Sequence, residues 1–203
     1  MNDAAIRPAA TVILWRQGLS GAEVLMGLRG AGAVFMPSKY VFPGGAVDPE
    51  DAGAALPFTL EGTCANRLQQ HCPVDAPTPD TLVAAALREL HEETGLTLHP
   101  GDAPALRFVF RAITPPGRSR RFDARFFLVD ATRLANDPED FTAASGELSH
   151  LHWIGVGAAR ALDLPFITEI VLAEVEALLN QAPDAGVPFF DNSGSVPTFR
   201  RLI

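Results

Sequence analysis

The chain has 203 residues, of which 47% are hydrophobic and 20% charged, and this balance fits one globular domain with a substantial core. Its net charge of −8 argues against a general affinity for nucleic acids or for acidic membranes. No apolar run is long enough to span a membrane, residues 1–8 contain no signal-peptide core, and two cysteines do not make a disulfide framework. We therefore expect one cytoplasmic domain, residues 1–203, with a small-molecule partner and no nucleic acid or membrane partner.

The first elements predicted are the two strands of a hairpin. Residues 9–15 and 23–29 are apolar runs separated by a glycine-containing turn. A loop at 30–37 follows, and residues 39–42 form a short strand that leads into Pro43-Gly44-Gly45.

The stretch 46–79 carries fewer signals. Residues 56–71 are expected to contain a helix, because apolar residues recur there at spacing four, and residues 73–79 form a proline-rich connection. The acids at the start of this stretch are expected to lie in a solvated loop: Asp48, Glu50 and Asp51.

The strongest helix signal covers residues 79–94. Thr78 is a suitable N-cap, Pro79 suits the first helical position, and Gly95 suits the left-handed residue after a helix. Apolar side chains recur at helical spacing and form one face of this helix: Val83, Ala86, Leu87 and Leu90.

Beyond this helix the chain returns to strands and ends in a helix and a tail. Strands are predicted at residues 106–113, 121–129 and 150–154, and an amphipathic helix at 164–179. Residues 183–203 contain proline and glycine and are expected to form an irregular tail. Strands and helices in this order favour a layered α/β/α domain.

Three glutamates share one side of the helix predicted at residues 79–94, opposite its apolar face. At about 100° per residue, Glu89, Glu92 and Glu93 fall within about 100° of one another. A cation would remove the repulsion among them, and oxygen-only ligands favour Mg²⁺ or Mn²⁺. Arg88 lies four residues before Glu92 and is placed to pair with it. The alternative is a solvated acidic face without a metal.

The pattern Arg88-Glu89-Leu90-His91-Glu92-Glu93-Thr94-Gly95-Leu96 resembles the second half of the Nudix box, and Phe42-Pro43-Gly44-Gly45 resembles the turn that opens it. In that family five residues separate the second glycine from a glutamate, which lies eight positions before the arginine. Here the residue eight positions before Arg88 is Asp80, and residues 46 to 79 separate it from Gly45. The box therefore resembles one split by an insertion of twenty-nine residues at 46–79.

This resemblance implies a Nudix-type α/β/α sandwich, in which a mixed β-sheet lies between helices and the box forms a loop-helix-loop motif. It also implies hydrolysis of a nucleoside diphosphate linked to another moiety. By resemblance, Glu92, Glu93 and the carbonyl of Gly44 are metal ligands, and Glu89 is a ligand or the base that takes a proton from water. Arg88 holds a ligand oxygen in place.

Four other positions have two alternative roles or no separate role. By resemblance, Glu147 in the late loop reaches the metal or acts as a base, and the alternative is an exposed loop acid. Asp80 supports the site through water or only stabilises the helix N-terminus. Gly45 and Gly95 are box positions without a separate role.

Arginines are the candidates for binding the phosphates of the substrate: Arg29, Arg118, Arg120 and Arg121. Coenzyme A diphosphatases of the family carry an arginine thirteen residues before the phenylalanine of the turn, and Arg29 and Phe42 have this spacing. Val34 and Ser38 depart from the rest of that pattern.

Coenzyme A or acyl-coenzyme A is therefore the expected substrate, with ADP-ribose or a nucleotide sugar as the alternative. A sensor that binds a nucleotide without cutting it is an alternative of another class. The complete set of helix glutamates and the lack of a basic DNA-binding segment argue against it.

The insertion begins after the Gly44-Gly45 turn and ends at the box helix, so we expect it to cover the site as a lid that tolerates shortening. A homodimer remains open.

Overall fold

The computed structural model describes residues 4–101 and 106–203, and within them nine strands form one mixed sheet. The sheet has the order β3-β2-β1-β6-β5-β8-β9, with β4 paired to β1 and β7 paired to β2. The strands are β1 (Ile6–Gly18), β2 (Gly21–Arg29), β3 (Tyr40–Val41), β4 (Gly44–Ala46), β5 (Arg107–Ile113), β6 (Arg121–Asp130), β7 (Leu148–Gly155), β8 (Val187–Asp191) and β9 (Thr198–Leu202).

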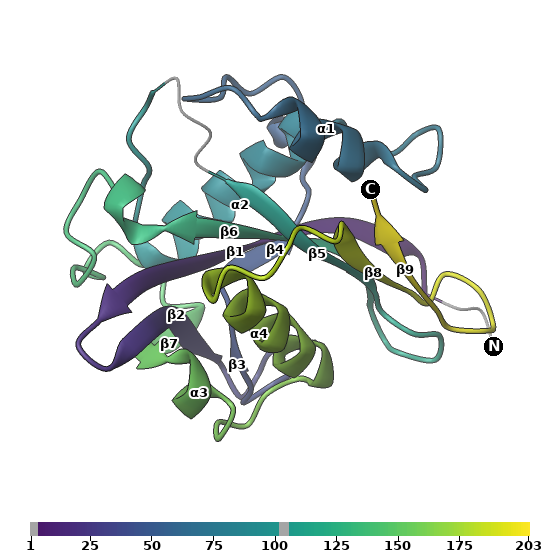
Figure 1. Cartoon of the computed structure of the whole chain (residues 1–203). Coiled ribbons are helices and arrows are strands. Elements are labelled where there is room, and N and C mark those ends of the chain that lie inside the picture. The colour runs from purple at the N-terminus through teal and green to yellow at the C-terminus, as the bar shows by residue number, and fades with distance from the viewer. Residues whose placement is uncertain (1–3, 102–105) are drawn as a thin grey trace.

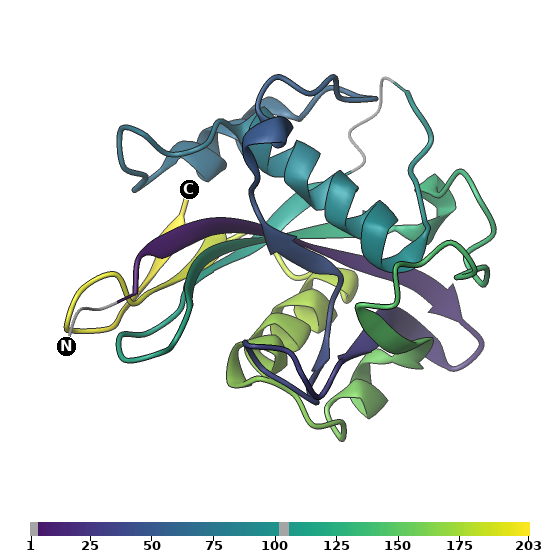
Figure 2. The same cartoon turned by 180° about the vertical axis from the view of Figure 1, so that it is seen from behind.

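Helices cover both faces of this sheet, which confirms the predicted α/β/α sandwich (Figure 1). On one face lie α1 (Gly62–Gln69) and α2 (Pro79–Thr94), and on the other lie α3 (Val156–Ala159) and α4 (Phe166–Leu179). The same two layers are visible from behind in Figure 2. None of the helices in the described part of the chain has the length and apolar character needed to cross a bilayer.

The predicted helix at residues 79–94 is confirmed as α2, with its expected caps. The Thr78 hydroxyl accepts a hydrogen bond from the Thr81 amide at 3.2 Å, and Gly95 has a φ of 77° with its amide bonded to the His91 carbonyl. The predicted opening hairpin is β1–β2, which pairs from Trp15 with Val24 to the turn. Local signals therefore located the elements that carry the box.

The insertion is part of the core, which argues against the expectation that it tolerates shortening. Its side chains Phe58, Leu60, Cys64 and Leu68 are all buried in the cluster that includes α2. Deleting them would expose apolar surface on α2 and β5, at about 25 cal/mol for each Å².

The expectation that residues 183–203 form an irregular tail is wrong, because they contain the hairpin of β8 and β9. Strand β8 pairs in parallel with β5, and Phe189 is 1% exposed. Pro188 within a strand of five residues hides the pattern in the sequence. The tail thereby extends the sheet at one edge.

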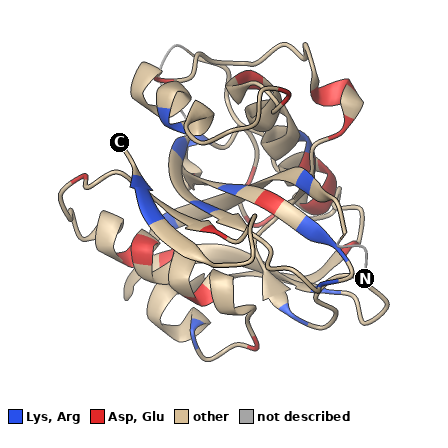
Figure 3. Cartoon of the chain, turned by 90° about the vertical axis from the view of Figure 1, so that its right-hand side faces the viewer, with Lys and Arg blue, Asp and Glu red and all other residues tan. Residues whose placement is uncertain are grey.

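A buried cluster of charged side chains lies where β5, β6 and α1 meet. The Arg111 guanidinium donates to both carboxylate oxygens of Asp123 at 2.8 and 2.7 Å, and its centre lies 4.2 Å from the Phe189 ring centroid. Arg125 lies 2.9 Å from the same carboxylate, and burial lowers the pKa of Arg125. In Figure 3 basic residues in blue alternate with an acidic residue in red along one strand of the sheet. One aspartate thus balances two buried arginines.

Asp123→Ala should therefore lower the free energy of unfolding by about 3–5 kcal/mol, since it leaves two buried cations without their anion. Urea denaturation measures this. Asp163→Ala is the control, because it removes only the exposed ion pair with Lys39 and should cost less than about 1 kcal/mol. Equal midpoints for the two variants would contradict the account.

Candidate active site

The last turns of α2 lie against the Gly44–Gly45 turn of β4. The Gly44 amide donates to Glu93 Oε2 at 2.7 Å, and Glu93 is 2% exposed. A Cβ at Gly44 would lie 2.6 Å from the Ala10 carbonyl oxygen, so only glycine allows β4 to approach β1 this closely. The other carboxylate oxygen, Glu93 Oε1, is buried without a hydrogen-bond partner.

Glu89 lies directly over Gly45. A Cβ at Gly45 would lie 2.3 Å from Glu89 Oε1, so the side chain occupies the space that glycine leaves free. Burial raises the pKa of Glu89, against the hydrogen bond from Arg88, and burial raises the pKa of Glu93 to about 8, against the bond from Gly44. The charges of Glu89 and Glu147 also raise the pKa of Glu93, and the opposing effect of the Arg29 charge is the smallest of these.

Arg88 holds this arrangement together. It donates to both oxygens of Asp51 at 2.9 and 3.0 Å, to Glu89 at 2.9 Å and to the Ala46 carbonyl at 3.0 Å. The expected pair with Glu92 is also present, at 3.2 Å. Arg88 thus fixes the Glu89 carboxylate relative to β4.

Asp51 was expected in a solvated loop, and that expectation is wrong. It is 4% exposed, and although burial acts to raise its pKa, the hydrogen bond from Arg88 holds that pKa below its ordinary value. Five residues separate Gly45 from Asp51, which is the spacing of the box acid. Asp80 instead lies exposed in the first turn of α2, about 13 Å along the helix from Glu89. The structure therefore favours Asp51 as the counterpart of the box acid.

The remaining box positions lie near this centre with different exposure. Glu92 is half exposed on the side of Arg88, and Gly95 caps α2. Glu147 is exposed, and Arg29 donates to it at 3.0 Å. The charge of Glu147 raises the pKa of both Glu89 and Glu93, which places it within electrostatic reach of them.

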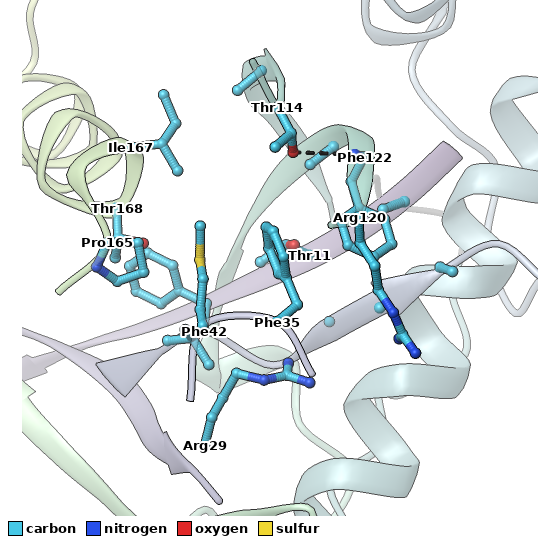
Figure 4. Close-up of a pocket in the computed structure, with 18 of the residues that line it drawn as sticks. Thr11, Arg29, Phe35, Phe42, Thr114, Arg120, Phe122, Pro165, Ile167 and Thr168 are labelled. Atoms are coloured by element: carbon cyan, nitrogen blue, oxygen red, sulfur yellow. Dashed lines mark hydrogen bonds between the residues drawn. The ribbon is translucent and has the colours of Figure 1, made fainter. Parts of the chain in front are cut away.

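A cavity of about 660 Å³ opens beside the Gly44–Gly45 turn. Its charged lining residues are Arg7, Arg29, Glu89, Arg120 and Glu147. The rest of its lining is uncharged, with residues such as Pro165, Ile167 and Phe42 (Figure 4). The cavity is large enough for a nucleotide-sized ligand, since small-molecule sites measure about 300–1,000 Å³.

The cavity lining corrects three expectations. Arg118 lies outside it, and Arg121 is buried and donates to the carbonyls of Thr114 and Asn192 at 3.0 and 2.6 Å, which holds two strand ends together. Of the insertion, only Ala46 lines the cavity, because the rest packs on the α2 face of the sheet. The insertion is therefore not a lid over this cavity.

The residues around Glu93 fit a hard divalent cation. Across residues 4–101 and 106–203, no three histidine, cysteine, aspartate or glutamate side chains are placed so that they could hold an ion. Mg²⁺ needs fewer, because it keeps several waters and binds through one or two carboxylates and the substrate's phosphates. The free Oε1 of Glu93 beside the Glu89 carboxylate supplies such ligands.

The Asp51–Arg88 contact predicts different stabilities for two aspartate variants. Asp51→Asn removes the anion from a buried ion pair and should lower the free energy of unfolding by about 2 kcal/mol. Asp80→Asn changes only an exposed acid near a helix N-terminus and should cost less than about 1 kcal/mol. Urea denaturation compares the two, and a larger loss for the second would reverse the assignment of the box acid.

Comparison with known proteins gives structural matches only. No family model and no curated protein matches the sequence. Among solved structures, a Nudix hydrolase from Alicyclobacillus acidocaldarius superposes with a TM-score of 0.63 at 27% identity, covering 87% of this chain and 92% of that chain.

Two further structures share the fold at lower identity. A MutT protein from Methanosarcina mazei Go1 matches with a TM-score of 0.56 at 16% identity, over 88% of this chain and 98% of that chain. An Ap4A hydrolase from C. elegans matches with a TM-score of 0.53 at 17% identity, over 87% and 99%. The fold, the likeness to the first structure and the glutamates of α2 support one assignment: this chain has the fold of the Nudix hydrolases.

Proposed function

We propose that this enzyme hydrolyses coenzyme A or an acyl-coenzyme A at its diphosphate, with Mg²⁺ or Mn²⁺ as cofactor. The observation that carries the hydrolase part is Glu93, whose Oε2 accepts from the amide of the cavity-lining residue Gly44 while its buried Oε1 has no hydrogen-bond partner. A divalent cation bound there would neutralise phosphate charge and make a bound water easier to deprotonate.

The side chains of this chain hold and orient the reacting groups. Gly44 fixes one oxygen of Glu93, and Arg88 fixes Glu89, so neither carboxylate needs to reorganise during the reaction. Glu147 is exposed beside them and can take a proton from an attacking water. Arg29 still has a buried Nε without a partner and can donate to a phosphate oxygen as well as to Glu147.

The choice of coenzyme A is supported by the pair Arg29 and Phe42. These residues match the spacing of the coenzyme A diphosphatases, and both line the cavity. ADP-ribose is the second candidate: the Nudix domain of Shewanella oneidensis NrtR, complexed with ADP-ribose, shares this fold with a TM-score of 0.51 at 13% identity. A sensor without catalysis fits less well, because every glutamate of the box helix is present.

The test is product analysis with Mg²⁺. Coenzyme A should give 3′,5′-ADP and 4′-phosphopantetheine, and excess chelator should stop the reaction. Glu93→Gln should lower kcat by at least about 100-fold, as expected when a charge-stabilising group is lost. Turnover that persists in chelator would exclude the metal-dependent reaction. Faster turnover of ADP-ribose than of coenzyme A would transfer the assignment to the second candidate.

Gly45 offers a test of the site that leaves the fold intact. In Gly45→Ala the new methyl group displaces the flexible Glu89 carboxylate, so kcat should fall by at least about tenfold while the melting temperature changes little. Gly32→Ala is the matched control, since it lies in the same cavity lining with no atom within 4 Å of its Cβ, and it should keep wild-type kcat. Normal kcat in Gly45→Ala would show that the position of Glu89 is unimportant.

A further inference from the structure

Three arginines line the cavity, and they differ in their partners. Arg7 lies 3.7 Å from Asp48, and Arg29 lies 3.0 Å from Glu147. Arg120 has no hydrogen bond or ion pair within the described residues. In a protein with a net charge of −8, a cavity-lining cation without an acidic partner is available for an anion from outside.

The surroundings of Arg120 are ordered by the hairpin that carries it. Phe122, two residues after Arg120, donates its amide to the Thr114 hydroxyl at 3.0 Å. This hydrogen bond closes the hairpin between β5 and β6. The Phe122 ring meets the Phe35 ring edge to face, with centroids 5.1 Å apart. This contact fixes the position of the backbone from which Arg120 extends.

The two arginines reach the cavity from different elements. Arg29 is the last residue of β2 and Arg120 directly precedes β6, and Figure 4 shows the Phe35 ring beside their side chains. Arg29 belongs to the end with Glu89 and Glu147, where the diphosphate is bound under the proposed function. A ligand with two anionic groups joined by a flat or apolar part can contact both arginines and lie against the phenylalanine rings.

We propose that Arg120 binds a second anionic group of the substrate, a phosphate monoester on the nucleotide, at a site separate from the diphosphate held by Arg29. This rests on the proposed function and narrows its substrate class to nucleoside diphosphates that carry an additional phosphate. A guanidinium suits a phosphate monoester because its planar fork donates two parallel hydrogen bonds.

Coenzyme A and 3′-dephospho-coenzyme A form the matched substrate pair, since they differ only in that phosphate. The wild-type enzyme should show a kcat/KM about tenfold or more higher for coenzyme A, the effect of one charge-assisted contact. Arg120→Gln should remove this preference by raising the KM for coenzyme A about tenfold. Its kinetics with dephospho-coenzyme A should be unchanged, because the group that Arg120 binds is absent there.

Arg118→Gln is the control for charge. It removes the same charge from the same hairpin, two residues away, at an exposed position outside the cavity lining, and it should keep the wild-type preference. Equal kcat/KM values for the two substrates with the wild-type enzyme would overturn the proposal. So would an equal loss for both substrates in Arg120→Gln, or the same loss of preference in Arg118→Gln.

Binding measurements separate this proposal from the proposed function. If neither form of coenzyme A is cleaved, the proposed function fails, and titration calorimetry with 3′,5′-ADP and 5′-AMP still decides the role of Arg120. The proposal requires 3′,5′-ADP to bind about tenfold more tightly than 5′-AMP, and Arg120→Gln to abolish the difference. Equal affinities in the wild-type enzyme would refute the second anion site.

Discussion

The structure of the site depends on the Arg88 guanidinium. It connects Glu89 on α2 with Asp51 and the Ala46 carbonyl, which lie about forty positions earlier in the stretch after the Gly44–Gly45 turn. A planar fork with five donors can satisfy all of these acceptors at fixed angles, which the single ammonium group of lysine could not do. Hydrogen bonding to Asp51 raises the pKa of Arg88, so the group keeps its charge. The acidic side of α2 is thereby held against β4.

The two glycines of β4 make that contact possible. Gly44 has no room for a Cβ because β1 lies against it, and Gly45 has none because Glu89 occupies the space. The result is a backbone amide, the buried Glu93 carboxylate and the partly buried Glu89 carboxylate within hydrogen-bonding distance or electrostatic reach of one another. The energetic cost of burying these acids appears as their raised pKa values, and a bound cation would remove it. A bound cation would therefore supply the positive charge that the acidic side chains of this site require.

The sequence predicted correctly those elements whose bounds depend on residues close together in the chain. The bounds of α2 followed from Thr78, Pro79 and Gly95, because capping depends on neighbours along the chain. The strand β8 was missed, since its parallel partner β5 lies far away in sequence and Pro188 interrupts the pattern. The buried Arg111 was missed for a related reason: its aspartate lies on the next strand, and nothing near Arg111 in sequence indicates burial.

The box acid shows how one motif can be aligned in two ways. Counting back from Arg88 selects Asp80, whereas counting forward from Gly45 selects Asp51, and the sequence alone gives an acid at both places. Only the contact with Arg88 distinguishes them. On the alignment that this contact favours, residues 52–87 separate the acid from the arginine where the family has seven residues, so the added length is the same twenty-nine but begins after the acid. The insertion can then pack against α2 and β5 without disturbing the turn, the acid or the arginine. Extra chain at this point enlarges the core on one face of the sheet, and the cavity on the other face is left to α4, the β5–β6 hairpin and the loop that carries Phe35.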